Sequence, residues 1–372
     1  LFIGHLSLSQ NITFSDNLQI SVLTCGNGEE LYSQFGHSAF RVKDLDKNID
    51  LVYNYGIFDF DAPNFYLNFA KGKLIYKLGL SWYSDFEDQY IYENREVKEQ
   101  ILDLTHIEQQ ELVAFLKHNA RPENASYQYD FFYDNCATKI RDVLNGVMSG
   151  KIEFDGSHIT THYTFRDLIN NNVPHNTWAN VGINIALGSV IDVEATPNEH
   201  MFLPEYIYQA FDNASLDGKS LVKENRVLLE RDPTRISESG FSIVSPYSIF
   251  TLISLVILFI TYRDYRNNTR NKTLDFSLLF ITGGIGVFIL LLWFATNHTA
   301  TVKNFNLLWA CASNIVVAFL LVKKARTWFS KYFGILFLLL IIQAFVWLFK
   351  VEVFAYALIP LLIAMGIRYL YL

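Results

Sequence analysis

The chain has 372 residues, of which 51% are hydrophobic, 16% aromatic and 18% charged, and its formal net charge is −7. This length is enough for two domains of ordinary size. The net charge is negative and no basic face gathers outside the apolar C-terminal region, which argues against nucleic-acid binding. The composition also divides the chain, because the part before about Gly240 is a polar domain rich in Tyr and Phe, whereas the part after it is mostly apolar.

The first ten residues are apolar and contain Ser7-Leu8-Ser9, which resembles the small-x-small pattern of a signal-peptide cleavage site. We therefore expect residues 1–10 to be the remnant of a signal peptide, which implies that the following domain is exported. The alternative is an apolar N-terminus that frays.

Residues between about Ile20 and Leu80 have the pattern of β-strands. The alternating segments His37–Lys43 and Leu51–Ile57 flank a turn-forming cluster, Asp44–Asn48, and this arrangement predicts a hairpin. A short helix is predicted over Glu29–Phe35. Further strands are expected at Ser21–Thr24, Leu74–Leu80 and Glu96–Leu102.

Helices are predicted after these strands. Thr105 and Glu108 form a capping-box pattern ahead of a helix that runs to about Asn119. A second helix opens at Cys136, with Asp134 or Asn135 as its N-cap. A third is expected around residues 165–170.

The C-terminal region contains five apolar runs, each near the roughly 20 residues that a helix needs to cross a bilayer. They cover about 245–262, 276–296, 304–322, 332–349 and 352–371. Basic residues concentrate in the first and third loops between these runs, whereas the second and fourth loops carry only Lys303 and Lys350. The positive-inside tendency therefore places the first and third loops in the cytoplasm and the polar domain on the outer face.

Cys136 is the strongest candidate for a reactive group. A thiol in the first turn of a helix is favoured as the thiolate by the helix dipole, and nearby Lys139 and Arg141 add positive charge. The alternative is a small buried residue that packs the turn. His37 follows Gly36 at the start of a strand, and an imidazole within reach of this cysteine makes a Cys–His dyad the better interpretation.

Such dyads commonly have a third polar group that orients the imidazole. In the predicted hairpin Asn54 lies roughly opposite His37, and we take it as the orienting residue, with Asp59 as the substitute. The backbone N–H of Cys136 is placed to donate to an oxyanion. The sequence names no second donor.

The other cysteines and histidines carry weaker signals of function. Cys25 and Cys136 could pair as a disulfide in an oxidising compartment, Cys25 could be a second thiol near the site, or Cys25 could be a buried strand-end residue, which is favoured. Cys311 lies in an apolar run. His158 and His162 have the i, i+4 spacing of metal ligands, but β-branched neighbours disfavour a helix there, so no metal site is expected.

Four segments resemble the motifs of one family, the Lnb-type lipoprotein N-acyltransferases. They are Thr24–Ala39 (TCGNGEELYSQFGHSA), Val52–Phe60 (VYNYGIFDF), Tyr129–Thr138 (YDFFYDNCAT) and Met201–Tyr206 (MFLPEY). The resemblance implies an α+β fold, a permuted papain-like domain of the NlpC type in which His37 precedes Cys136, followed by an all-α domain of five transmembrane helices. The corresponding domains are a periplasmic catalytic domain over residues 11–240 and a membrane domain over residues 241–372.

The resemblance also implies a reaction. An acyltransferase of this kind moves an acyl chain from a membrane phospholipid, through a Cys136 thioester, to the α-amine of a diacylglyceryl-cysteine lipoprotein. Its partners are then the phospholipid donor, the diacylated lipoprotein acceptor and the bilayer, with no cofactor and no metal. The expected location is the inner membrane of a bacterium, with the catalytic domain in the periplasm.

Two other functions stay open from the residues. The first is a membrane-anchored cell-wall peptide hydrolase of the NlpC type, although such an enzyme needs one anchor rather than five. The second is a non-enzymatic module in which Cys136 and His37 are structural.

Overall fold

The computed structural model describes residues 12–58, 63–235, 242–323 and 328–372. The signal-like start and Asp59 lie outside these residues. The chain divides into two compact units. The first runs to Phe69 and includes Lys73–His162 and the segment from Ala195; the second includes Ala70–Gly72, Tyr163–Glu194 and the C-terminal helices. Residues 163–194 thus belong to the membrane-helix unit, although they precede the boundary near residue 240 that we expect from the sequence.

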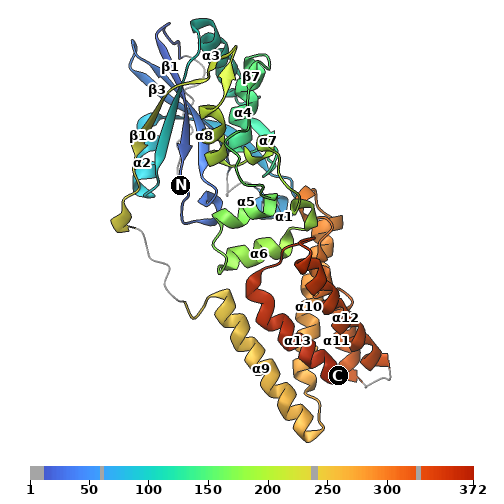
Figure 1. Ribbon diagram of the computed structural model, residues 1–372. Helices are drawn as coiled ribbons and strands as arrows, with labels where there is room; N and C mark the ends of the chain where they lie inside the picture. The colour runs from blue at the N-terminus through green and yellow to red at the C-terminus, as the bar shows by residue number, and fades with distance from the viewer. Residues whose placement is uncertain (1–11, 59–62, 236–241, 324–327) are drawn as a thin grey trace. The chain divides into compact units, whose positions relative to one another are not determined.

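An antiparallel sheet forms the centre of the first unit (Figure 1). Within the described residues it has seven strands in the order β10-β5-β1-β2-β3-β4-β6. The strands are β1 (Leu18–Cys25), β2 (His37–Asp44), β3 (Ile49–Ile57), β4 (Ile75–Trp82), β5 (Val97–Leu102), β6 (Ser126–Gln128) and β10 (Val222–Leu229). The predicted hairpin is confirmed, because β2 pairs with β3 in a register that sets Phe40 opposite Tyr53.

Helices and short strands complete the first unit. The helices are α2 (Tyr83–Tyr92), α3 (His106–Asn119), α4 (Cys136–Val147), α7 (Pro197–His200) and α8 (Pro204–Asp212), with 3₁₀ turns at Leu31–Ser33 and Pro233–Arg235. The helix expected over Glu29–Phe35 is thus only the first of these turns. A small sheet pairs β7 (Ile152–Glu153), β8 (Ser215–Leu216) and β9 (Lys219–Ser220). Helix α1 (Phe65–Ala70) leads into the second unit.

Strand alternation gives the main sheet two apolar faces, which explains its Val-, Ile- and Phe-rich sequence. One face packs against α3, α4 and α8 and buries Val22, Phe40 and Tyr53. The other face, which includes Leu23 and Val52, packs against Phe86 and Tyr90 of α2. The site described below lies at one end of this sheet, where α4 begins.

The second unit consists of helices that are mostly apolar. They are α5 (Phe165–Asn172), α6 (Trp178–Ala186), α9 (Pro246–Asn267), α10 (Lys272–Phe294), α11 (Asn314–Lys323), α12 (Trp328–Leu348) and α13 (Ile359–Tyr371), with 3₁₀ turns at Ser189–Ile191, Thr299–Thr301, Phe305–Leu308 and Tyr356–Leu358. Of the described helices, α9, α10 and α12 are long and apolar enough to cross a membrane, and the apolar segment Tyr356–Tyr371 is shorter.

The five predicted spans therefore differ from the helices at two places. In the run 304–322, continuous helix starts only at Asn314, and in the run 352–371 it starts only at Ile359. Polar side chains explain the first break, because the Asn306 amide donates to the Asn184 carbonyl (2.9 Å) and to Glu352 (2.9 Å) rather than lying on a lipid-facing helix. Such irregular backbone is tolerated where protein surrounds it.

Residues 163–194 are fastened to the loops of the membrane helices within the second unit. Asn304 donates to the Ile185 carbonyl (2.8 Å), and the Val353 N–H donates to Asp192 (3.0 Å). Asp192 also pairs with the buried Arg166 (2.8 Å). At the other end of the helices, Arg368 of α13 pairs with Asp264 of α9 (2.9 Å) and Asp275 of α10 (2.8 Å).

Candidate active site

Cys136 is the first residue of α4, and Asn135 holds the start of this helix. The Asn135 side-chain oxygen accepts from the N–H groups of Ala137 (2.8 Å) and Thr138 (2.9 Å), and its amide donates to the carbonyls of Phe131 (2.7 Å) and Phe202 (2.8 Å). Every polar atom of this buried side chain is thereby used. Asn135, rather than Asp134, is the N-cap, and it fixes the half-buried Cys136 at the helix start.

His37 is the first residue of β2, and the glycine before it permits the tight approach of this strand. Gly36 has φ +78°, and a Cβ there would lie 2.7 Å from the Cys25 carbonyl oxygen of the neighbouring strand. A side chain at this position would be strained by both the backbone conformation and the contact. Because His37 directly follows Gly36 and begins β2, its imidazole lies at the end of the sheet.

Asn54 of β3 lies within hydrogen-bond distance of His37, through its Oδ1 and the His37 Nε2. Because an amide oxygen only accepts, Nε2 is the donor in this bond, and Nδ1 is the ring nitrogen that remains available to the thiol. After Asn54 the pairing of β3 with β4 is irregular. Gly56 lies in this irregular part of β3 and has φ +91°, and a Cβ on it would lie 3.5 Å from the Cys136 Cβ. The structure therefore brings Cys136, His37 and Asn54 together.

The thiol and the imidazole shift each other's pKa. Burial alone raises the pKa of Cys136, but the charge of His37, a hydrogen bond with it and the N–H groups of Ser38 and Ala137 lower that pKa below its ordinary value. Burial alone lowers the pKa of His37, but Cys136 and the bond from Asn54 raise it above its ordinary value. Both shifts favour a thiolate–imidazolium pair, which is the reactive form of such a dyad.

The cations expected to assist Cys136 are engaged elsewhere. Lys139 pairs with Asp134 (2.6 Å), and Arg141 pairs with Asp142 (2.7 Å). The backbone N–H of Ser38, which sequence reasoning did not name, takes part instead. Only the tertiary contact between β2 and α4 places it there, so no sequence signal could have identified it.

The three cysteines are free, so Cys25 and Cys136 are not joined by a disulfide. Cys25 pairs with His37 in the β1–β2 register, yet its side chain packs among Phe86, Tyr90 and Val97. Burial raises the pKa of its thiol to about 12. Cys25 is therefore an unreactive core residue, and a second nucleophile at the site is not supported.

His158 and His162 show no metal-like arrangement. Across the part of the chain that the structure describes, no group of three or more His, Cys, Asp or Glu side chains could hold a metal ion. Cys311 is half-buried in the second unit, where its sulfur lies 3.1 Å from the Ser313 hydroxyl.

The fold and the site together define a class of membrane-bound proteins: a mixed sheet-and-helix domain that carries a Cys–His pair, followed by a domain of apolar helices. Residues 8–171 match the family model described as the Lnb N-terminal periplasmic domain, and residues 237–372 match the one described as the Lnb transmembrane domain. The chain belongs to the Lnb family. No curated protein and no solved structure matches it.

The two family models and the apolar helices identify an inner-membrane protein with a periplasmic N-terminal domain. This agrees with the orientation predicted from the basic loops, since the polar domain was expected on the outer face. Membership of the Lnb family also indicates a function related to lipoprotein N-acyltransferases of the Lnb type.

Proposed function

We propose that this protein is a lipoprotein N-acyltransferase. In the proposed reaction Cys136 takes an acyl chain from a membrane phospholipid and transfers it to the α-amine of a diacylglyceryl-cysteine lipoprotein. The observation that supports this most strongly is the contact of Cys136 with His37, which in turn is bonded to Asn54, in a chain of the Lnb family. The order of His37 before Cys136 is that of a permuted papain-like domain of the NlpC type.

The first half-reaction forms a thioester. The Cys136 sulfur attacks the ester carbonyl of the phospholipid after its proton has passed to His37. The tetrahedral intermediate collapses, the glycerol oxygen leaves with the proton from His37, and a lysophospholipid departs. The candidates to stabilise the oxyanion are the backbone N–H of Cys136, named from the sequence, and that of Ser38, which lies at the sulfur.

The second half-reaction forms the amide. The uncharged α-amine of the lipoprotein attacks the thioester carbonyl, His37 accepts a proton from the nitrogen, and the Cys136 thiol is regenerated. An amide is more stable than a thioester, so this step is strongly downhill. Membrane anchoring raises the local concentration of both lipid substrates around the site.

The direct test is mass spectrometry of a lipoprotein N-terminal peptide from bacteria that depend on this protein for N-acylation. We expect triacylated peptide with the wild type and only diacylated peptide with Cys136→Ala. Cys311→Ala is the matched control, because it removes a thiol from the second unit and leaves the dyad intact.

Triacylation that persists with Cys136→Ala would exclude this cysteine as the nucleophile. If neither protein gives triacylated peptide but the wild type cleaves a cell-wall peptide, the hydrolase function replaces the acyltransferase. Absence of both activities would favour the non-enzymatic module.

A further inference from the structure

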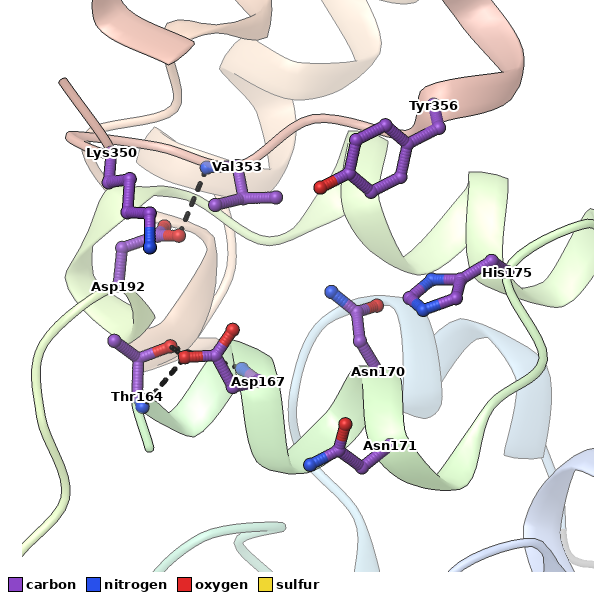
Figure 2. Close-up of a pocket in the computed structure, with 9 residues that line it drawn as sticks. All are labelled: Thr164, Asp167, Asn170, Asn171, His175, Asp192, Lys350, Val353 and Tyr356. Carbon is purple, nitrogen blue, oxygen red and sulfur yellow. Dashed lines mark hydrogen bonds between the residues drawn. The ribbon is translucent and has the colours of Figure 1, made fainter. Parts of the chain in front are cut away.

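The second unit contains a polar cavity of about 270 Å³ whose lining includes none of the dyad residues (Figure 2). Its walls come from the start and body of α5, from the segments before and after α6, and from the loop between α12 and α13. The lining residues are Thr164, Asp167, Asn170, Asn171, His175, Asp192, Lys350, Val353 and Tyr356. The volume suits a group smaller than a drug-sized ligand.

In the orientation predicted from the basic loops, the cavity lies where the membrane helices end on the periplasmic side. Lys350 follows α12 directly, and the neighbouring Leu348, Phe349 and Val351 expose 72%, 71% and 47% of their surface. Apolar side chains that flank a polar cavity at the end of a span occupy the depth where acyl chains meet lipid head groups. A lipid bound there would keep its tails among the apolar side chains.

The hydrogen bonds inside the wall determine which atoms remain for a ligand. The Asn170 oxygen accepts from Asn180 (3.0 Å) and Asn184 (3.0 Å), so its amide nitrogen is left as a donor. Asp167 uses Oδ2 to accept from the Thr164 N–H (3.0 Å) and hydroxyl (2.9 Å), which leaves Oδ1 as an acceptor (Figure 2).

The charges in the cavity are of both signs. Asp192 is compensated by Arg166 (2.8 Å) and by the Val353 N–H (3.0 Å). The remaining full charges are the Asp167 carboxylate on α5 and the Lys350 ammonium on the opposite loop, and Figure 2 shows them on different walls. A ligand that complements them must itself carry a cation and an anion.

We infer that this cavity binds the zwitterionic head group of a phospholipid, with an ammonium facing Asp167 and a phosphate facing Lys350 and the Asn170 amide. Lysine ammonium groups bind phosphate as point charges, and an alkylammonium donates to carboxylates. The inference rests on the proposed function in one respect: it identifies this lipid as the acyl donor.

Binding can be measured without catalysis. The full-length protein carrying Cys136→Ala, in detergent micelles, is titrated with dioleoyl-phosphatidylethanolamine or dioleoyl-phosphatidylglycerol, and bound lipid is counted by native mass spectrometry. We expect one ethanolamine lipid to bind about tenfold more tightly than the glycerol lipid, because only the former offers Asp167 a cation.

Two variants separate the two charges. Lys350→Asn should weaken the binding of both lipids about tenfold. Asparagine tolerates the positive φ of 53° found at this position. Lys303→Asn is the matched control, since Lys303 has φ 55° and does not line the cavity. Asp167→Asn keeps an oxygen for the Thr164 N–H and should abolish the preference for ethanolamine.

Equal binding of the two lipids, or equal effects of Lys350→Asn and Lys303→Asn, would overturn the inference. The same variants, made in protein that retains Cys136, then test the link to catalysis. There Lys350→Asn should raise the KM for the phospholipid about tenfold with little change in kcat. Acyl transfer with unselective binding would contradict the inference alone. Selective binding without any acyl transfer would contradict the proposed function alone.

Discussion

Two opposing effects act on the pKa of the Cys136 thiol. Burial favours the neutral thiol, whereas the His37 imidazolium and two backbone N–H groups favour the thiolate, and the second effect is larger. At Cys25 burial outweighs a hydrogen bond with Tyr90 and the charge of Arg95, and the pKa of its thiol rises. Two cysteines in the same unit thus differ in reactivity because of their neighbours rather than their exposure alone.

This difference predicts the pH dependence of alkylation. Iodoacetamide should modify Cys136 with a midpoint below the ordinary thiol value of about 8.5, and His37→Ala should move that midpoint upward because burial is then uncompensated. The rate is measured by peptide mass spectrometry in a Cys25→Ala, Cys311→Ala background. A midpoint that His37→Ala leaves unchanged would show that the two side chains do not interact.

Asn54 is expected to act through His37 as a positioning residue. Asn54→Ala should lower kcat roughly 10- to 100-fold and shift the alkaline limb of the pH profile downward, because the His37 imidazolium of the reactive pair loses a bond that raises its pKa. Asn54→Asp retains an acceptor oxygen and should recover most of the rate. The exposed Asn213→Ala is the control, and an Asn54→Ala profile identical to the control profile would argue against a role in positioning.

At the scale of elements, one side chain joins two loops to a helix. Asn135 caps α4 and also holds the carbonyls of Phe131 and Phe202, which belong to two of the family motifs recognised in the sequence. The Met201–Tyr206 motif, to which sequence reasoning assigned no role, therefore supports the start of α4. The position of Cys136 depends on segments more than sixty residues apart.

Replacing this cap should affect both stability and activity. Asn135→Ala removes two hydrogen bonds to loop carbonyls and two from helix N–H groups, so we expect a loss of about 2–4 kcal/mol and no measurable acyl transfer. Thr105→Ala removes the exposed capping box of α3 and should cost about 1 kcal/mol with full activity. Thermal unfolding of the full-length protein in micelles measures both, and equal losses for the two variants would contradict the role of Asn135.

At the scale of the whole molecule, the chain does not divide where its hydropathy changes. Residues 163–194 precede the long apolar C-terminal region, yet they belong to the unit of the membrane helices. Glu352 takes part in the contacts between them: it is fully buried, accepts from the Phe305 N–H (2.8 Å) and bonds Asn306, which in turn donates to the Asn184 carbonyl. Burial raises the pKa of this carboxyl group from 4.5 to about 8.

Glu352 therefore predicts how stability depends on pH. The folded unit retains a proton that the unfolded chain releases above pH 4.5, so this contribution is complete below that value and is lost as the pH rises toward 8. We expect the free energy of unfolding to fall by up to roughly 1.4 kcal/mol per pH unit in this window. Thermal unfolding in micelles between pH 5.5 and 8.5 measures the slope.

Glu352→Gln should flatten that slope, since an amide does not titrate, although it places a donor beside one of the two N–H groups and lowers stability at acid pH. Glu194→Gln, an exposed change in the same unit, should retain the slope of the wild type. A wild-type slope in the Glu352→Gln protein would assign the pH dependence to another group.

The sequence by itself determined several local elements and named Cys136 and His37 as the candidate dyad. Period-two alternation predicted β2 and β3, the capping box of Thr105 predicted α3, and the Asp134-Asn135-Cys136 segment predicted the start of α4, because each signal depends on neighbours along the chain. The family followed from four such short motifs.

Only the tertiary structure decided the rest. The bond between His37 and Asn54, the Ser38 N–H at the thiol and the burial of Cys25 depend on how strands and helices pack. Two of the apolar runs are broken by turns, since Asn306 finds partners in distant segments. The charges of Asp167 and Lys350 meet at one cavity for the same reason: contact between residues far apart in the chain leaves no periodic mark on the sequence.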